Sequence, residues 1–168
     1  RDLQSWRRDA LEAHRQAVSV PGLHLDRSPT GSGKTFNTTE AIKRADSSLV
    51  VLPTHANVRE RVLEMQEAGI PAVPFPELTD ATCMNYAEAT RAQAAGLPVG
   101  RTACIGCPHK KGCVYRKEAA AAGRARHRVA THERLKRSPS VAQVRLRGGG
   151  RADVSVVVID ENPVGVLQ

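Results

Sequence analysis

Aromatic residues and long apolar runs are both scarce in this chain. Only five of its 168 residues are Phe, Tyr or Trp, so a core must be built mainly from Val, Leu, Ile and Ala. No apolar run reaches the length of about 20 residues that a membrane-spanning helix needs. The chain starts at Arg1 with no secretory signal. We therefore expect an intracellular, cytoplasmic protein with no membrane partner, and a piece of a longer chain.

Acidic residues are nearly missing from one third of the sequence. Between Arg101 and Arg151 there are 14 Lys or Arg and two acids, a balance of +12, whereas the rest holds 11 bases and 15 acids, or −4. A solvated face usually mixes both signs, so this excess favours a polyanionic partner such as nucleic acid. An interfacial membrane helix is disfavoured, because residues 116–128 lack large apolar side chains.

Apolar periodicity predicts alternating strands and helices. The expected helices are 2–19, 35–45, 56–68 (capped by Thr54 and ended by Gly69) and a short one from His132. The expected strands are 23–27, 48–52, 70–73, 128–131 and 154–159, with a flexible joint at 148–150. This alternation indicates an α/β fold, a parallel sheet with helices on both faces.

The alternation is interrupted once. Residues 79–124 contain all four cysteines, are mainly helical in pattern and show no convincing strand. We therefore expect a cysteine-rich insertion over 79–124, between a first part of the sheet domain (1–78) and a return to it (125–168).

A glycine-rich loop follows the first predicted strand. It matches the Walker A form G-x-x-x-x-G-K-[ST], except that serine stands at its first position. Its glycines let backbone N–H groups point at phosphate oxygens, its lysine reaches the β- and γ-phosphates, and its threonine binds Mg²⁺. Because a strand precedes it and a helix follows, a chance loop is disfavoured. The predicted nucleotide-binding residues are Ser28, Pro29, Thr30, Gly31, Ser32, Gly33, Lys34 and Thr35.

Two acids follow the most apolar predicted strand. Asp160 and Glu161 stand where a Walker B motif belongs, since the carboxyl ends of parallel strands face the crevice of the phosphate loop. Asp160 would hold Mg²⁺ with Thr35, and Glu161 would orient and deprotonate the attacking water. We predict an ATP hydrolase with Lys34, Asp160 and Glu161 as catalytic residues, and an adenine contact near residues 4–8.

The four cysteines lie between these motifs. Cys83 precedes Cys104-x-x-Cys107 by 20 residues, and Cys113 follows after five more. A two-residue gap lets two sulfurs face one centre, so the spacing predicts a four-thiolate metal site in preference to buried thiols or disulfides. Zinc and a 4Fe–4S cluster fit this spacing equally.

The order of the motifs resembles the first motor domain of the XPD/DinG-like iron–sulfur helicases of superfamily 2. Residues 28–35 are similar to helicase motif I and residues 51–54 (Val-Leu-Pro-Thr) to motif Ia, while residues 160–163 (Asp-Glu-Asn-Pro) take the place of the DEAH box. Residues 113–116 and 129–135 are similar to the family's passage from the last cysteine into a strand and short helix. The resemblance spans nearly the whole chain.

The resemblance implies a RecA-like motor domain that couples ATP hydrolysis to translocation on single-stranded or forked DNA and to unwinding, together with a second motor domain. It favours a 4Fe–4S cluster over zinc and fits a prokaryotic or mobile-element origin. It places a DNA backbone contact at Thr54. The basic excess adds Lys110, Lys111 and Arg116 as DNA contacts, and Tyr115 as a residue that either stacks on a base or packs beside the metal site.

This chain departs from the family's pattern at three points. Ser28 stands where motif I usually has Ala or Gly, and Asn162-Pro163 replaces the Ala-His of the DEAH box. The third is the missing second motor domain, whose arginine is worth about 10³–10⁵ in rate, so the chain alone should hydrolyse ATP slowly. Two other interpretations stay open: a zinc-containing P-loop replication ATPase that binds nucleic acid without unwinding it, and a small-molecule kinase with structural zinc, which the positive charge disfavours.

Overall fold

The computed structural model describes residues 2–22, 24–26 and 33–160. Of the predicted site, Ser28, Pro29, Thr30, Gly31, Ser32 and Glu161 lie outside the described residues, as do Asn162 and Pro163. The elements in chain order are α1 (Leu3–Ser19), α2 (Lys34–Ile42), β1 (Ser48–Leu52), α3 (His55–Glu67), β2 (Ala72–Pro74), α4 (Tyr86–Ala94), η1 (Val99–Arg101), α5 (Val114–Ala122), β3 (His127–Thr131), α6 (His132–Arg137), η2 (Pro139–Ala142), β4 (Gln143–Arg145), β5 (Arg151–Asp153) and β6 (Val156–Ile159).

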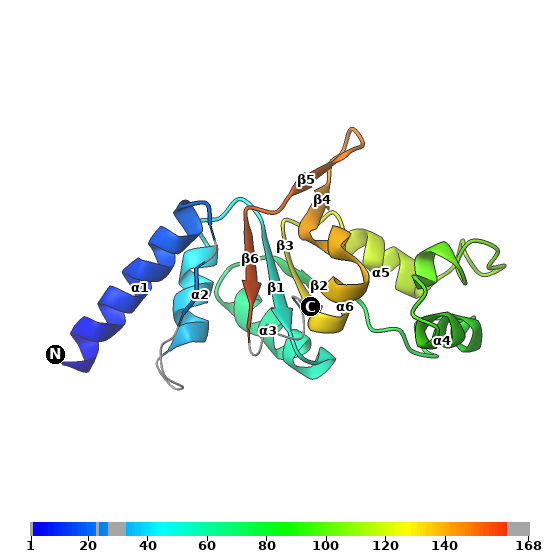
Figure 1. Cartoon of the computed structure of the whole chain (residues 1–168), viewed down its shortest axis with the longest axis horizontal. Helices are drawn as coiled ribbons and strands as arrows, with labels where there is room; N and C mark the ends of the chain where they lie inside the picture. Colours follow the sequence, from blue (N-terminus) through cyan, green and yellow to red (C-terminus); the bar gives the residue numbers. More distant parts are fainter. Residues whose placement is uncertain (1, 23, 27–32, 161–168) are drawn as a thin grey trace.

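Four parallel strands form the central sheet, in the order β2-β3-β1-β6 (Figure 1). β1 pairs with β3 on one side and β6 on the other, so that Leu52 ends opposite Thr131 and Val51 opposite Ile159. Every β1 residue is buried, which explains why this strand reads as a nearly continuous apolar run. The prediction of a mixed α/β fold with a parallel sheet is confirmed.

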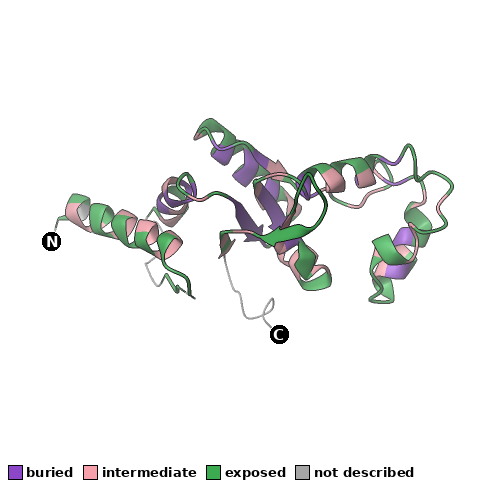
Figure 2. Cartoon of the chain, turned by 90° about the horizontal axis from the view of Figure 1, so that it is seen from above, coloured by how far each residue is buried: buried purple, intermediate pink, exposed green. Residues whose placement is uncertain are grey.

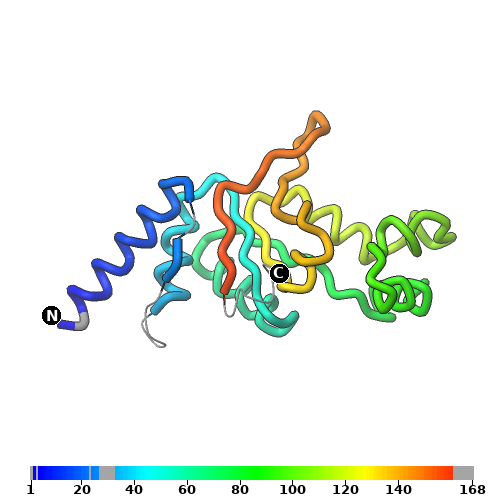
Figure 3. Tube along the Cα trace, viewed as in Figure 1, coloured from blue at the N-terminus to red at the C-terminus, as the bar shows by residue number. Residues whose placement is uncertain are grey.

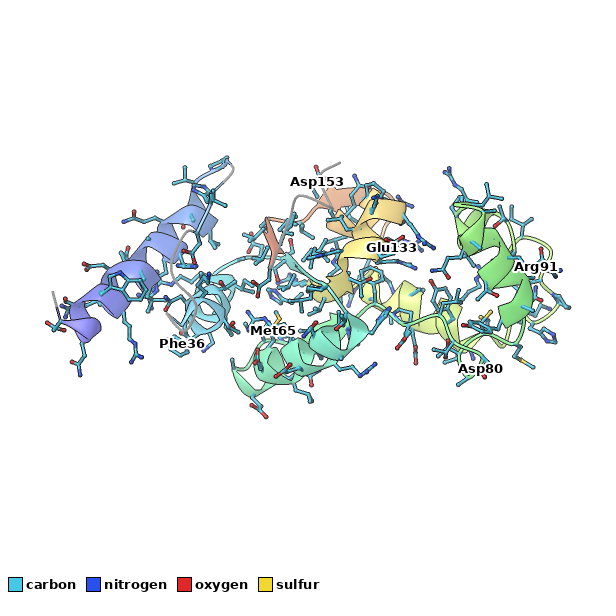
Figure 4. The ribbon with its side chains drawn as sticks, turned by 60° about the horizontal axis from the view of Figure 1, so that its bottom comes forward. Phe36, Met65, Asp80, Arg91, Glu133 and Asp153 are labelled. Atoms are coloured by element: carbon cyan, nitrogen blue, oxygen red, sulfur yellow. The ribbon has the colours of Figure 1, made fainter. Side chains whose placement is uncertain are left out.

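Helices cover both faces of the sheet, because alternate strand residues point to opposite faces. On one face the sheet packs against α2 and α3, through Ile42, Val50, Leu52, Val58, Val62, Met65, Ile70, Ala72 and Val129. On the other it packs against α5, α6 and η2, through Leu49, Val51, Phe75, Ala122, Ala130 and Val141, with Leu135 partly buried beside them. Figure 2 shows the buried residues concentrated on the central strands and α3, and Figure 4 labels Met65 on α3.

The elements are laid out along the long axis of the molecule (Figure 3). Helices α1 and α2 lie at one end, the sheet is central, and the cysteine-containing segment lies at the other end. Residues 79–124 form α4, η1 and α5, with no strand among them. This segment is joined to the sheet by α5, whose last residue, Ala122, is fully buried in the second core. Among the described residues, no helix has the length and apolar character to cross a membrane.

The strand expected at residues 23–27 is a wrong prediction where it can be checked. Residues 24–26 have no regular structure, and the side chain of Leu25 is 68% exposed. Asp26 instead lies 3.3 Å from Nε2 of His14 on α1. The segment before the predicted phosphate loop thus contacts α1 through Asp26.

The flexible joint expected at residues 148–150 is also wrong. These glycines form the turn of an antiparallel hairpin, β4–β5. Gly149 and Gly150 have φ values of 85° and 81°, in the left-handed region that favours glycine. The following strand therefore starts at Val156 rather than Val154, because Val154 donates its backbone N–H to Ala142 at 2.9 Å instead of joining the ladder.

The predicted ends of α3 are confirmed, and they explain a shift in β2. Thr54 accepts a hydrogen bond from the backbone N–H of Asn57 at 3.2 Å, as an N-cap does. Gly69 follows the helix with a φ of 82°. The N–H of Ile70 then closes the helix on the carbonyl of Met65 at 2.8 Å, so β2 starts at Ala72, two residues later than expected.

Candidate functional site

Three strands deliver polar residues to one edge of the sheet. β1, β3 and β6 are parallel and end side by side. The first polar residue after each strand is Thr54, His132 and Asp160, respectively. The backbone N–H of Asp160 donates to the carbonyl of Val51 at 3.0 Å, which extends the ladder one residue beyond β6. The backbone of Asp160 is therefore held by the sheet itself.

His132 is a second support for Asp160. Its Nε2 lies 2.9 Å from the carbonyl oxygen of Asp160, so a protonated Nε2 donates to it. This contact joins the start of α6 to the end of β6, across the end of β1. Sequence analysis did not single out this role for His132, although its position directly after a predicted strand was the available signal.

Helix α2 begins at the same edge of the sheet (Figure 1). Gly33 precedes it with a φ of 83°, a left-handed conformation that favours glycine at the end of the phosphate loop. The side chain of Lys34 is half-buried, and that of Thr35 is exposed. The amino end of a helix offers unpaired N–H groups, which favour an anion.

Arg61 on α3 contacts the first turn of α2. Its side chain is only 6% exposed, and Nη2 donates to the carbonyl of Thr35 at 3.4 Å, while Nη1 donates to Glu64 at 3.0 Å. Sequence analysis missed this residue, because its contact with α2 depends on how α3 packs.

A hollow of about 430 Å³ lies between α1 and α2, next to the phosphate helix. It is lined by Arg7, Arg8, Leu11, Gly33, Phe36 and Asn37. Arg7 and Arg8 fall within residues 4–8, where an adenine contact was expected. Phe36 is 64% exposed and offers an aromatic face at the rim. The hollow therefore lies beside the amino end of α2, close to the residues where an adenine contact was predicted.

Thr54 stands at the sheet edge with basic neighbours. It is exposed, and its hydroxyl both caps α3 and donates to Oδ1 of Asn57 at 2.6 Å. Burial lowers the pKa of the adjacent His55, and Glu77 opposes this effect while Arg59 and Arg134 add to it. Of these two arginines, Arg59 is paired with Glu77 at 3.3 Å.

Tyr115 packs inside the protein, so its expected role in stacking on a base is not supported. Its side chain is 8% exposed, and its hydroxyl is hydrogen-bonded to Arg134 on α6. The guanidinium of Arg134 lies 5.8 Å from the centre of the Tyr115 ring and 5.2 Å from that of Phe75. The alternative interpretation, packing, applies. Lys110 and Lys111 are exposed and Arg116 is half-buried, so these three stay available to a phosphate.

The four cysteines are free thiols gathered in one region. Cys83 and Cys113 are buried, and the chain beside them is joined by a hydrogen bond of 3.0 Å from the N–H of Tyr115 to the carbonyl of Thr82. Burial raises the pKa of the Cys104 thiol, and the other three cysteines raise it further while Arg116 opposes them.

This donor set suits zinc or a 4Fe–4S cluster, since both are bound by thiolates. Among the described residues, however, no three His, Cys, Asp or Glu side chains are grouped closely enough to hold a metal ion. The four-thiolate site therefore stays a prediction from spacing.

Comparison with known proteins adds no information on identity. No family model, curated protein or solved structure matches this chain.

Proposed function

We propose that this chain is the first motor domain of an ATP-dependent DNA helicase, with a RecA-like fold and an iron–sulfur cluster. The observation that carries the proposal is the shared edge of the sheet, where α2 begins and where β1, β3 and β6 end. In parallel α/β sheets, ligands bind at this edge. Here it brings the helix that starts at Lys34 to the same end of the sheet as Asp160.

Nucleotide binding follows from the residue types at this edge. Lys34 reaches the β- and γ-phosphates, and Thr35 and Asp160 hold Mg²⁺ between them. His132 and the ladder bond to Val51 fix the backbone of Asp160. Glu161, the residue after it, orients the attacking water. Arg7, Arg8 and Phe36 line the space where the base lies.

The DNA strand runs along the same edge and toward the cysteine region. Thr54 contacts a backbone phosphate, and Lys110, Lys111 and Arg116 continue the positive path. A second motor domain would close over the nucleotide and supply an arginine to the site. The four cysteines would hold an iron–sulfur cluster, which would fix the shape of residues 79–124 toward the DNA.

Nucleotide binding is tested by titrating a fluorescent ATP analogue with Mg²⁺ into the wild-type chain and two lysine variants. Lys34→Ala removes a charge-assisted bond worth about 1.5–3 kcal/mol, so affinity should fall roughly 10- to 150-fold. Lys43→Ala is the matched control, because Lys43 caps the other end of α2 and is paired with Glu40. Equal affinities for the two variants would contradict the phosphate site.

The metal is tested separately, by anaerobic purification followed by iron, sulfide and zinc analysis. We expect iron and sulfide with a visible absorbance band, both lost in Cys104→Ser. A colourless protein with one zinc would instead favour the P-loop replication ATPase that binds nucleic acid without unwinding it. Binding of nucleotide without any metal would remove the cluster from the proposal and leave the ATP site standing.

A further inference from the structure

The β4–β5 hairpin carries exposed positive charge with no acidic partner among the described residues of the sheet domain. It presents Arg145, Arg147 and Arg151 within seven residues, and all three are exposed. We propose that this hairpin is a second nucleic-acid contact, whose arginines bind the phosphodiester backbone. The inference deepens the proposed function, on which it rests for the class of partner.

Two of the hairpin's charges destabilise the hairpin itself. Arg145 and Arg151 are paired directly across the two strands, and like charges at such positions repel. The hairpin's one acid, Asp153, is engaged instead by the side-chain amide of Gln143 at 3.1 Å. Among the described residues, none forms a salt bridge with any of the three arginines. An anion bound between the side chains of Arg145 and Arg151 would remove this repulsion.

The foot of the hairpin is firmly held, so its arginines are presented by a fixed scaffold. The buried Arg128 on β3 donates Nη1 to the carbonyl of Gln143 at 2.9 Å. The N–H of Arg145 donates to the carbonyl of Gly123, at the end of α5, at 2.9 Å. The hairpin is thereby anchored to the sheet and to the helix that starts beside Cys113. Figure 1 shows its turn projecting away from both.

The turn itself suits close approach of a backbone. Its three consecutive glycines, Gly148 to Gly150, carry no side chain that would hold a ligand away. Leu146 is the one large apolar residue there, and it is 50% exposed. One apolar side chain offers too little apolar area for insertion into a membrane interface. Arginine's planar fork matches phosphate oxygens in pairs, so a nucleic-acid backbone is the polyanion that this surface fits best.

The hairpin faces a different segment of nucleic acid from Thr54. The strands of the sheet run away from the hairpin, toward the edge where Thr54 and Asp160 lie (Figure 1). A strand bound at that edge does not reach the hairpin without passing the side of the domain. We therefore assign the hairpin to the duplex or to the second strand of a fork.

The test is fluorescence anisotropy with labelled single-stranded, duplex and forked oligonucleotides over a range of salt concentrations. Arg147→Gln/Arg151→Gln removes two charges and leaves the anchored Arg145 in place. Arg147→Lys/Arg151→Lys keeps the charges. The control is Arg44→Gln/Arg91→Gln, which removes two charges elsewhere; Figure 4 shows Arg91 on α4 at one end of the molecule and Asp153 of the hairpin near its middle. Unchanged thermal unfolding confirms that each variant folds.

The expected effect follows from counterion release. Two lost phosphate contacts reduce the slope of log K against log salt by about 1.8 for duplex DNA, or roughly 60-fold in affinity at 0.1 M relative to 1 M salt. The forked and duplex probes should lose this affinity in the glutamine variant and keep most of it in the lysine variant.

Four results would overturn the inference. An unchanged slope in the glutamine variant, with DNA binding by the wild type intact, rejects the hairpin and leaves the proposed function standing. An equal loss in the control shows that only net charge matters. Loss of binding to polyglutamate, with no loss to DNA, assigns the hairpin to an acidic protein. If the wild-type chain binds none of the probes, its DNA partner is rejected together with the hairpin, while ATP binding is judged by the Lys34 experiment.

Discussion

Replacing Arg128 by methionine is expected to stabilise the protein, although it removes a hydrogen bond. Arg128 is fully buried in β3, and only its Nη1 has a partner, the carbonyl of Gln143. Its Nε and Nη2 are buried with no partner among the described residues. Burial lowers the pKa of this guanidinium from its ordinary value, because a charge removed from water is destabilised.

The magnitude follows from two opposing effects. The bond to Gln143 involves a charged donor and is worth about 1.5–3 kcal/mol. Burying an ion costs several kcal/mol, and replacing buried ionic groups with apolar side chains of similar volume is often neutral or stabilising by about 1–4 kcal/mol. Arg128→Met should therefore raise the free energy of unfolding by roughly 1–3 kcal/mol. Arg128→Ala instead leaves a cavity, and large-to-Ala changes in a core cost about 2–5 kcal/mol.

Urea unfolding followed by far-ultraviolet circular dichroism measures both variants. With equal m-values, the midpoint should move up for methionine and down for alanine. If methionine destabilises the chain as much as alanine does, the reasoning is refuted, since the guanidinium would then be stabilised by its surroundings. The methionine variant should also bind forked DNA less tightly, because the carbonyl of Gln143 at the foot of the hairpin loses its donor.

Three further predictions concern the sheet edge and its supports. Burial lowers the pKa of both His55 and His127 below 6.5. The stability that comes from keeping them neutral is therefore present above pH 6.5 and lost as the pH falls through their folded-state pKa values. Thermal unfolding measured at pH steps of about one unit between about 8 and 5 should show this loss of stability, and His127→Asn should reduce it whereas the exposed control His24→Gln should not. Tyr115→Phe leaves Arg134 without its hydroxyl partner and should cost about 1–3 kcal/mol by urea unfolding, whereas Tyr86→Phe, at an exposed ring, should cost nothing measurable. Thr54→Ala removes the cap of α3 and should cost about 0.5–2 kcal/mol together with DNA affinity, and Thr54→Ser should restore both; loss of stability in the serine variant would contradict the capping role.

Patterns local in the chain predicted most of the secondary structure. The buried run of β1, the cap at Thr54 and the glycine after α3 were all readable, because each depends on neighbouring residues. The expected strand over 23–27 failed for the opposite reason. A strand needs a partner, and the described residues of that segment contact α1 instead of the sheet.

The candidate site shows the same division. Lys34, Thr35 and Asp160 were identified by spacing, since their chemistry needs residue types in a fixed order. His132, Arg61 and Arg134 were missed as supports, because each acts on a residue far away in the sequence. Tyr115 was assigned two possible roles, and burial decided between them.

The sequence by itself determined that a glycine-rich loop of the Walker A type, four cysteines and an acidic strand end occur in this order. It also determined the excess of positive charge between Arg101 and Arg151. Residue type and spacing suffice for such statements. Only the tertiary structure decided which strands are neighbours, and thus that Thr54, His132 and Asp160 share one edge. It also converted residues 148–150 from an expected joint into the turn of a basic hairpin, because the partner of each strand is chosen by packing and register, which no short stretch of sequence contains.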